Sequence, residues 1–256
     1  MKFLNFKKKK LCTICGSHVN FIEDSPNLRE GLKCPKCMSI SRNRALALVL
    51  LHQFCPDKNS IKDALEVFYK MKIYELSCYS PLSKFLRGSK NYTCSEYLDG
   101  IKPGNVDPES GIRCEDLRKL TFENQSFDLV ISEDVLEHVD GYEKAFREIN
   151  RVLKTGGFHI FTIPLYGDRK TTKRAITTEK GIVHLLPPEY HGDPLREKIL
   201  VYTDFGSDII DILRDFGFKT EIFFPAKKEE EKFGVYRTPV LISEKIKNLS
   251  KICTSK

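Results

Sequence analysis

The sequence contains no long hydrophobic run. No stretch approaches the run of about 18 apolar residues that a membrane-spanning helix needs. The first residues also lack the apolar segment of a secretory signal peptide, because a short mixed stretch leads directly into Lys7–Lys10. No internal repeat is found, so nothing indicates a repeat architecture. We therefore expect neither a membrane span nor a secretory signal.

The composition is that of an ordinary globular protein. Of the 256 residues, 41% are hydrophobic and 30% are charged, which is unlike disordered, collagenous or membrane chains. A chain of this length can bury one large core, or one core beside a small satellite domain.

The excess of positive charge is unevenly distributed. The formal net charge is +7, and the first 60 residues hold 11 basic and 4 acidic residues, which accounts for all of it. The remaining residues hold equal numbers of each sign. This asymmetry indicates two parts with different surfaces. Lys7–Lys10 is expected to be a solvated basic tail.

The nine cysteines bear on the redox state of the chain. An odd number of cysteines in a chain without a signal peptide favours reduced thiols and a cytoplasmic location. Four of them form a motif, described next. The other five are expected to be ordinary reduced residues: Cys55, Cys78, Cys94, Cys114 and Cys253.

Two C-x2-C pairs predict a structural zinc ribbon. Cys12 and Cys15 form the first pair, and Cys34 and Cys37 form the second after an 18-residue gap. This gap lies in the range of about 15–20 residues found in zinc ribbons. Four thiolates leave no coordination position for water, so the site is expected to be structural. Four unrelated buried thiols and a redox pair are the weaker alternatives.

A helix is predicted next, from residue 41 to about 54, ending before Pro56. Arg42 and Arg44 lie at its start. A solvated first turn is favoured for them over a contact with an anion or a substrate.

From residue 72 the pattern alternates between strands and helices, which predicts a parallel sheet with crossover helices. The expected strands cover residues 72–77, 92–96, 111–116, 127–132, 158–164, 219–224 and 238–243. The expected helices cover 82–86, 142–153 and 204–216, with Gly156–Gly157 as a helix stop and a charged loop at 227–232. The expected domains are a tail and ribbon (1–40), a connecting helix (41–60), an α/β domain (61–243) and a polar tail (244–256).

Acidic residues follow several of these strands. In an open α/β sheet, ligands bind beyond the carboxyl ends of the strands. Glu96 comes 21 residues after Glu75, close to the spacing of about 20 at which a carboxylate binds a ribose diol. Asp116 could accept a hydrogen bond from an adenine amino group, and Ser132-Glu133-Asp134 ends a further strand. Each acid alone is best explained as a solvated side chain, and only their common edge favours a site.

Three segments together resemble the class I S-adenosylmethionine-dependent methyltransferases, and in particular their type 11 domain. They are Phe127–Ser132 (FDLVIS), Val135–Val139 (VLEHV) and Arg151–Gly157 (RVLKTGG). The resemblance implies a Rossmann-like seven-stranded sheet of order 3-2-1-4-5-7-6 with the seventh strand antiparallel, and S-adenosylmethionine as methyl donor. Chains with a zinc ribbon ahead of the methyltransferase domain look closest.

The resemblance also implies a set of cofactor-binding positions. Glu96 corresponds to the acid that binds the ribose, and Asp116 to the acid on the adenine side. The whole set is Glu75, Ser77, Glu96, Tyr97, Asp116, Leu117, Ser132 and Glu133.

The loop after the first strand departs from the family pattern. It reads Glu75–Pro81 without a glycine, where the family has a glycine-rich loop that lets the backbone approach the cofactor. This leaves open a weakened or lost cofactor site.

The segment after the fifth strand is the expected acceptor side. His191 lies between Glu189 and Asp193 and is the candidate catalytic base, although a structural turn explains it equally well. His138 is interpreted as a packing residue or a hydrogen-bonding partner on the cofactor side.

Three functions remain open at this point. A small-molecule or glycan methyltransferase is favoured, an RNA methyltransferase that docks RNA on its basic ribbon is the second, and a non-catalytic binding protein is the third. The sequence names neither the acceptor nor the oligomeric state.

Overall fold

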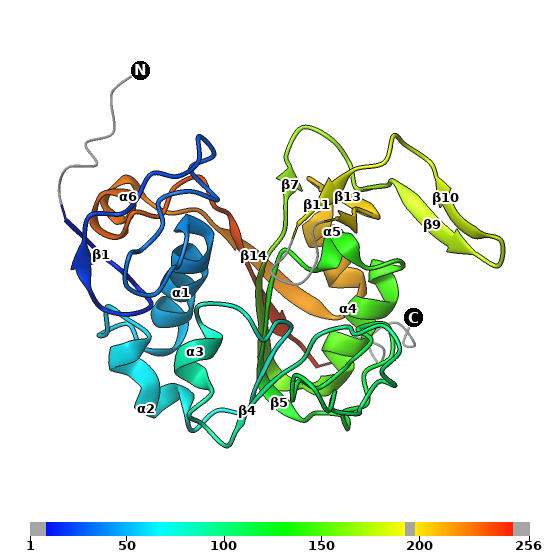
Figure 1. The fold of residues 1–256 in the computed structure, drawn as a ribbon, viewed down its shortest axis with the longest axis horizontal. Coiled ribbons are helices and arrows are strands. Elements are labelled where there is room, and N and C mark those ends of the chain that lie inside the picture. Colours follow the sequence, from blue (N-terminus) through cyan, green and yellow to red (C-terminus); the bar gives the residue numbers. More distant parts are fainter. Residues whose placement is uncertain (1–8, 193–197, 248–256) are drawn as a thin grey trace, which may run out of the picture. The chain divides into compact units, whose positions relative to one another are not determined.

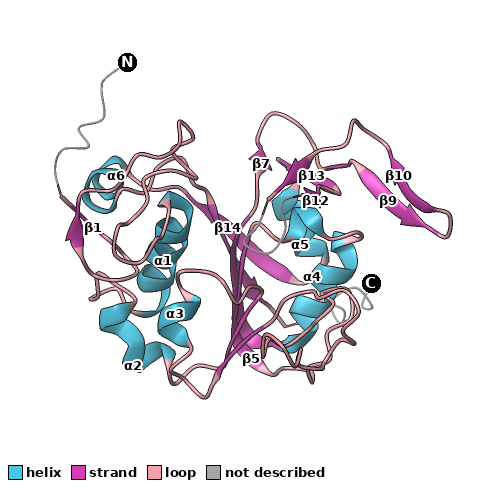
Figure 2. Ribbon diagram, viewed as in Figure 1, coloured by secondary structure: helices cyan, strands magenta, loops and turns pink. Residues whose placement is uncertain are grey.

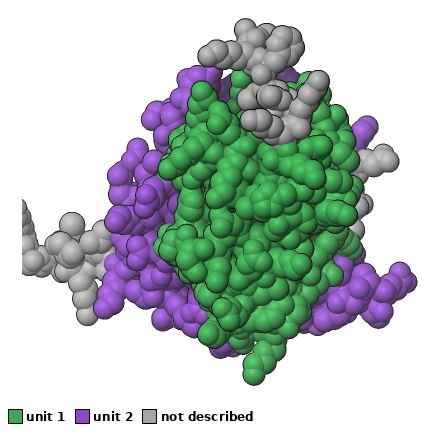
Figure 3. Space-filling view, turned by 90° about the vertical axis from the view of Figure 1, so that its left-hand side faces the viewer, with its two compact units in different colours: residues 1–71, 79–92, 222–240 green, residues 72–78, 93–221, 241–256 purple. Residues whose placement is uncertain are grey.

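The computed structural model describes residues 9–192 and 198–247. The chain divides into two compact units, which are coloured separately in Figure 3. The first unit comprises residues 1–71, 79–92 and 222–240, and the second comprises residues 72–78, 93–221 and 241–256. The units cross the domain boundaries expected from the sequence, because residues 222–240 belong with the N-terminal part of the chain.

Among its described residues, the first unit contains a small hairpin and five short or medium helices (Figure 1). Strands β1 (Lys10–Leu11) and β2 (His18–Val19) pair antiparallel. The helices are α1 (Ser41–Phe54), η1 (Lys62–Ala64), α2 (Leu65–Phe68), α3 (Ser83–Leu86) and α6 (Lys227–Phe233). The prediction of α1 is confirmed, and its apolar residues from Ala45 to Leu51 are buried.

The charged segment predicted as a loop at 227–232 is helix α6 instead. Its first turn is stabilised by Glu229, whose carboxylate accepts a hydrogen bond of 2.7 Å from the backbone N–H of Ala226. Gly234, with φ of 62°, ends the helix in the left-handed conformation that glycine adopts most easily.

Arg44 is not in a solvated first turn, as was expected, but is fully buried. Its guanidinium donates hydrogen bonds to the carbonyl oxygens of Ser39 (2.7 Å), Phe233 (3.2 Å) and Gly234 (2.7 Å). It also stacks 3.7 Å from the ring centroid of Phe21. Burial lowers the pKa of Arg44 to about 10, opposed by the nearby cysteines. Arg44 therefore connects the cysteine-bearing segment to the end of α6.

Other basic residues of the first unit also form hydrogen bonds within the protein. Lys10, expected in a solvated tail, is buried in β1 and donates to the Glu231 carbonyl oxygen at 2.6 Å. Burial lowers the pKa of Lys10. Arg42 contacts both carboxylate oxygens of Glu30, with a shortest distance of 3.1 Å. The positions Lys7 and Lys8 lie outside the described residues.

Most residues of a six-stranded sheet belong to the second unit; its strands are drawn in magenta in Figure 2. Its order is β14-β15-β6-β5-β3-β4. The strands are β3 (Ile73–Glu75), β4 (Tyr92–Cys94), β5 (Phe127–Glu133), β6 (Leu153–Thr162), β14 (Phe218–Phe223) and β15 (Val240–Lys245). Strands β3, β5 and β6 run parallel, and β15 pairs antiparallel with β6. Strand β5 is apolar and its centre is buried, as expected of a central parallel strand.

The expected third strand at 111–116 is absent from the sheet, so the sheet has six strands instead of seven. Outside the sheet, this segment forms an isolated parallel bridge between Glu96 and Cys114. Residues 105–114 fold back on themselves instead, because Cys114 donates its N–H to the Asn105 carbonyl and Val106 pairs antiparallel with Arg113.

Helix α4 (Tyr142–Val152) confirms the predicted amphipathic helix, with Ala145, Phe146, Ile149 and Val152 buried. The glycine pair does not end this helix, as was expected, since β6 begins at Leu153 and contains both glycines. A Cβ atom at Gly157 would approach the carbonyl oxygens of Lys154 and Asp128 to 2.9 and 3.0 Å. Glycine is therefore required there by close backbone packing.

Short strands follow β6: β7 (Leu165–Tyr166), β8 (Thr172–Lys173), β9 (Ala175–Thr178), β10 (Gly181–His184), β11 (Tyr190–His191), β12 (Ile199–Leu200) and β13 (Thr203–Gly206). The helix predicted at 204–216 is shorter, because residues up to Gly206 pair with β7 and only Ile209–Asp215 form α5. No helix among the residues that the structure describes is long and apolar enough to span a bilayer.

A buried histidine lies within the sheet. His159 of β6 is fully buried, stacks on Phe161 at 4.0 Å between ring centroids, and contacts the Ser132 hydroxyl through Nε2 at 2.9 Å. Burial lowers the pKa of His159 to about 3, since the protein interior disfavours the charged imidazolium.

This pKa predicts a loss of stability in mild acid. The unfolded chain binds a proton on this histidine below about pH 6.5, whereas the folded chain does not until about pH 3. Between about pH 7.5 and about pH 5, His159 should therefore lower the free energy of unfolding by about 2 kcal/mol. Urea unfolding at several pH values measures this change in the free energy of unfolding. The loss should be smaller by that amount in His159→Gln, and unchanged in the control His184→Ala, whose histidine is exposed on β10.

Candidate functional site

The carboxyl ends of the parallel strands meet at one edge of the sheet. Glu75 pairs in register with Ile131, and Glu133 pairs with Thr162, so β3, β5 and β6 end close together. Glu75 is buried, and its carbonyl oxygen accepts a hydrogen bond from Ser95, just after β4. The edge predicted from the sequence is therefore present, and it is the place where open α/β sheets bind ligands.

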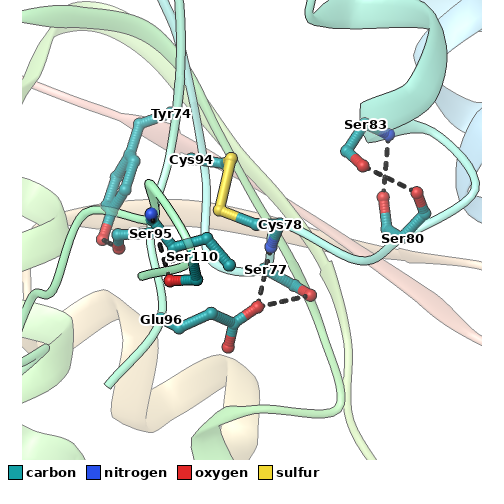
Figure 4. The surroundings of a disulfide bond; sticks show 10 residues. Tyr74, Ser77, Cys78, Ser80, Ser83, Cys94, Ser95, Glu96 and Ser110 are labelled. Atoms are coloured by element: carbon teal, nitrogen blue, oxygen red, sulfur yellow. Dashed lines mark hydrogen bonds between the residues drawn. A yellow bond between two sulfur atoms is a disulfide. The ribbon is translucent and has the colours of Figure 1, made fainter. Parts of the chain in front are cut away.

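Glu96 lies at this edge and contacts the loop after β3 (Figure 4). Its Oε1 accepts hydrogen bonds from the backbone N–H of Cys78 (2.7 Å) and from the hydroxyl of Ser77 (3.1 Å). Next to it, the hydroxyls of Tyr74 and Ser95 contact each other at 2.7 Å in the buried layer. The glycine-free loop is thus held by the acid that the sequence assigns to a ribose.

Cys78 and Cys94 form a disulfide bond, which corrects the expectation that both are reduced (Figure 4). Their Cα atoms are 5.3 Å apart. Cys78 belongs to the loop after β3, and Cys94 is the last residue of β4. The bond therefore joins the two segments that carry Ser77 and Glu96.

The carboxylate of Asp116 accepts hydrogen bonds from a neighbouring arginine. Arg118 donates from Nε to Oδ1 (3.0 Å) and from Nη2 to Oδ2 (2.8 Å). Burial acts to raise the pKa of Asp116, but the hydrogen bonds and charge of Arg118 hold it below its usual value. Two other predicted positions are more open: Tyr97 is 48% exposed, and Leu117 is partly exposed.

The end of β5 carries the remaining predicted positions. The Ser132 hydroxyl points to His159 inside the sheet, so its side chain is occupied there. Glu133 is partly exposed at the edge. Asp134 follows with φ of 53°, an unusual conformation for a residue other than glycine. Its backbone N–H and its carboxylate both bond to Thr162, which stabilises this turn.

The turn leads into η2 (Leu136–His138), where a second group of polar side chains lies. Oε1 of Glu137 is 3.8 Å from Nε2 of His138 and 4.0 Å from Nδ1 of His191. The two imidazole rings meet edge to face, with 5.1 Å between their centroids. The candidate base His191 is therefore brought beside Glu137 and His138.

Arg174 stabilises the segment that precedes His191. It donates to the buried carboxylate of Asp204 (2.7 Å) and to the Pro187 carbonyl oxygen (2.8 Å), and it lies 3.2 Å from the Glu189 carboxylate. The proline-rich segment at 187–189 is thereby attached to β13. The sequence had indicated a defined loop here without naming the residue that holds it.

In the first unit, the four predicted cysteines converge. Their Sγ atoms lie within 4.8 Å of one another. Cys12 and Cys37 are 3.6 Å apart, and Cys15 and Cys34 are 3.8 Å apart. Sulfur atoms about 2.3 Å from a tetrahedral zinc ion are separated by about 3.8 Å, so this cluster fits zinc.

Two features of the site were missed from the sequence. The pairing of Cys78 with Cys94 has no spacing signature. Glu137 and His138 stood in a recognised motif, yet 53 residues separate His138 from His191, so nothing marked them as one group. The only available signal was the presence of a histidine in each of two polar segments.

Parts of the chain are similar to known methyltransferases. Residues 94–161, from the end of β4 into β6, match the family described as "Methyltransferase domain". A sarcosine/dimethylglycine N-methyltransferase from Aphanothece halophytica is 42% identical over 50 residues. That stretch covers 20% of this chain and 18% of the relative, so the chain matches less than a fifth of that protein.

Solved structures give a more distant likeness. An S-adenosylmethionine-dependent methyltransferase from Mesorhizobium loti is 18% identical, with a TM-score of 0.41, covering 68% of this chain and 89% of that one. A 1,6-didemethyltoxoflavin-N1-methyltransferase from Burkholderia thailandensis, solved with S-adenosylhomocysteine, is 14% identical with a TM-score of 0.41. It covers 73% of this chain and 76% of its own.

The disulfide predicts a redox-dependent stability. Its two cysteines are 16 residues apart, and closing a loop of about this length stabilises a folded chain by up to about 3 kcal/mol. Cys78→Ser should lower the free energy of unfolding by up to this amount in oxidising buffer and by much less in reducing buffer. Urea unfolding with and without a thiol reductant measures the difference. Alkylation of both cysteines in denatured, unreduced protein would contradict the bond.

Proposed function

We propose that the chain is a class I S-adenosylmethionine-dependent methyltransferase that acts on a small-molecule or glycan acceptor. The observation that carries the proposal is the position of Glu96. It lies at the carboxyl edge of the sheet, 21 residues after Glu75 and inside the segment that matches a methyltransferase domain. A carboxylate in this position can accept both hydrogen bonds of a ribose diol.

The other positions take roles around the same cofactor. Asp116 and Leu117 would contact the adenine side, with Tyr97 beside the ribose and Ser77 and Glu75 at the amino-acid end. Glu133 would contribute from the end of β5, and Ser132 through its backbone, since its hydroxyl bonds to His159. S-adenosylmethionine supplies an electrophilic methyl group on its sulfonium. The task of the residues is to bind and align it.

The glycine-free loop is compatible with this role. The backbone N–H of Cys78 donates to Glu96, and the disulfide attaches the same residue to β4. These contacts define the path of the loop without the turn that glycine residues provide in the family. They support cofactor binding over the non-catalytic alternative.

A small acceptor is favoured over RNA. The related N-methyltransferase carries the name of small amine substrates, sarcosine and dimethylglycine. The basic N-terminal part also presents less free charge than its composition suggests, because Arg44 and Lys10 are buried and Arg42 pairs with Glu30. For a hydroxyl acceptor, His191 stays the predicted base, while an amine acceptor needs little help from a base.

We further propose that the four clustered cysteines hold one structural zinc ion. Their sulfur spacing supports it, and so does the chemistry of four thiolates, which leave zinc no open position. Zinc would supply folding free energy to a short, polar segment. The cytoplasmic location expected from cysteine usage also stays a prediction.

Replacing the ribose acid tests the cofactor site. Glu96→Gln should weaken S-adenosylmethionine binding about 10- to 100-fold in a calorimetric titration, because hydrogen bonds to a charged group contribute about 1.5–3 kcal/mol. With methyl-labelled S-adenosylmethionine and fractionated cell extract, the wild-type protein should label the small-metabolite or sugar fraction, and the variant should label it less.

The matched control is Glu179→Gln, which removes an exposed acid between β9 and β10 and should leave both measurements unchanged. Absence of S-adenosylmethionine binding by the wild-type protein at millimolar concentration would overturn the proposed function. Label found in RNA alone would show that the acceptor is RNA and not a small molecule or glycan.

The zinc proposal predicts stoichiometric metal. Purified protein should contain one zinc per chain by elemental analysis. Cys34→Ser should lose it and lower the melting temperature of the chain, since the remaining thiolates hold zinc weakly and the metal supplies folding free energy. The control Cys55→Ser removes a buried cysteine outside the cluster and should keep the zinc. A Cys34→Ser protein with full zinc content would contradict the assignment.

A further inference from the structure

The group formed by Glu137, His138 and His191 has the composition of a metal site. One carboxylate oxygen and two ring nitrogens lie within 4.8 Å of one another, and no cysteine is among them. Two donor atoms that are each about 2.1 Å from a metal ion lie about 3.0–4.2 Å apart, depending on the angle between them. The separations of 3.8 and 4.0 Å between Glu137 and the two histidines fall in this range.

The hydrogen bonds of His138 orient its lone pair toward the group. Nδ1 is 2.9 Å from the carbonyl oxygen of Leu200, and a carbonyl can only accept. Nδ1 therefore carries a hydrogen, and in the neutral ring the lone pair of Nε2 lies on the side of Glu137. Metal-binding histidines commonly donate their other nitrogen to a backbone carbonyl, which fixes the tautomer in this way.

His191 lies between two carboxylates. Its Nε2 is 3.5 Å from the carboxylate of Glu189, while its Nδ1 faces Glu137. The Nδ1 atom of His191 and the Nε2 atom of His138 therefore both lie on the side of Glu137. Two ring nitrogens and one carboxylate oxygen thus lie together, an arrangement that a bound cation would stabilise.

Burial and backbone contacts make this a built site. Glu137 is only 1% exposed, and a cation bound by its carboxylate would offset the cost of burying that charge. The Glu137 carbonyl accepts a 2.7 Å hydrogen bond from Tyr202, and β11 pairs with β12 through Tyr190–Leu200 and His191–Ile199. The segments that carry the three side chains are thus joined by their backbones.

We propose that Glu137, His138 and His191 bind a divalent first-row transition-metal ion. Two imidazoles and one carboxylate suit Mn²⁺, Fe²⁺ or Zn²⁺ and leave open coordination positions. These positions would take an oxygen atom of the methyl acceptor, from a hydroxyl or a carboxylate. This last role rests on the proposed methyltransferase function; the binding of the ion does not. His191 acts here as a ligand, so it does not serve as a base at the same time.

Metal titration of the full-length protein tests the site. Protein carrying one zinc per chain is titrated with Mn²⁺, and free Mn²⁺ is followed by electron paramagnetic resonance. A second equivalent of Zn²⁺ is followed in parallel by equilibrium dialysis. The wild-type protein should bind one further ion per chain. His191→Ala and Glu137→Gln should each weaken that binding at least tenfold.

The control His184→Ala removes an exposed histidine of β10 and should bind like the wild type. Far-UV circular dichroism and thermal melting identify any variant that is misfolded, and Glu137→Gln, which preserves side-chain shape, provides the second test. Failure of the wild-type protein to bind either ion would overturn the proposal. Equal binding by both folded variants would overturn it too.

The outcome is separable from that of the proposed function. Metal binding without S-adenosylmethionine binding would leave the metal site standing and remove the methyltransferase role. S-adenosylmethionine binding without metal binding would remove the metal site and leave the proposed methyltransferase function standing. If both bind, the rate of methyl transfer by protein carrying one zinc per chain should rise on addition of Mn²⁺ in the wild type and not in His191→Ala. An unchanged wild-type rate would remove the acceptor-binding role.

Discussion

The parallel pairing of β3, β5 and β6 is the constraint on which the candidate site depends. Parallel strands bring their carboxyl ends to one edge, and the register places Glu75 beside Ile131 and Glu133 beside Thr162. Glu75 and Ile131, which are 56 positions apart in the chain, thereby become neighbours in the sheet. The segment after β5 carries η2 and the polar group around Glu137. Glu96 follows β4, whose next residue Ser95 donates its backbone N–H to the carbonyl oxygen of Glu75 at the end of β3.

The contacts at this edge show two ways of holding polar groups in position. At the end of β4, Glu96 accepts hydrogen bonds from the loop after β3, and a disulfide joins the same two segments. At the end of β5, Asp134 adopts a left-handed turn that is stabilised by Thr162. The first arrangement defines a loop that lacks glycine. The second directs η2 toward β11 and β12, where His138 meets His191.

The first unit depends on a different interaction. Arg44 is fully buried and donates to three backbone carbonyls, and its positive charge lies near the four cysteines. A buried guanidinium is stable only when its donors are satisfied, which the carbonyls of Ser39, Phe233 and Gly234 achieve. The basic character of the N-terminal sequence is therefore partly an internal, structural property, and it argues less for nucleic-acid binding than the residue counts did.

The sequence by itself determined the local and periodic features. The helix at 41–54, the amphipathic helix from Tyr142, the apolar strand β5 and the paired cysteines follow from spacing and apolar periodicity, which local interactions enforce. The positions of Glu75 and Glu96 at strand ends could be predicted for the same reason. Tertiary structure alone decided the loss of the third strand, the burial of Arg44, the Cys78–Cys94 bond and the meeting of His138 with His191. Each of these depends on which distant segments pack together, and residue spacing along the chain carries no information about that.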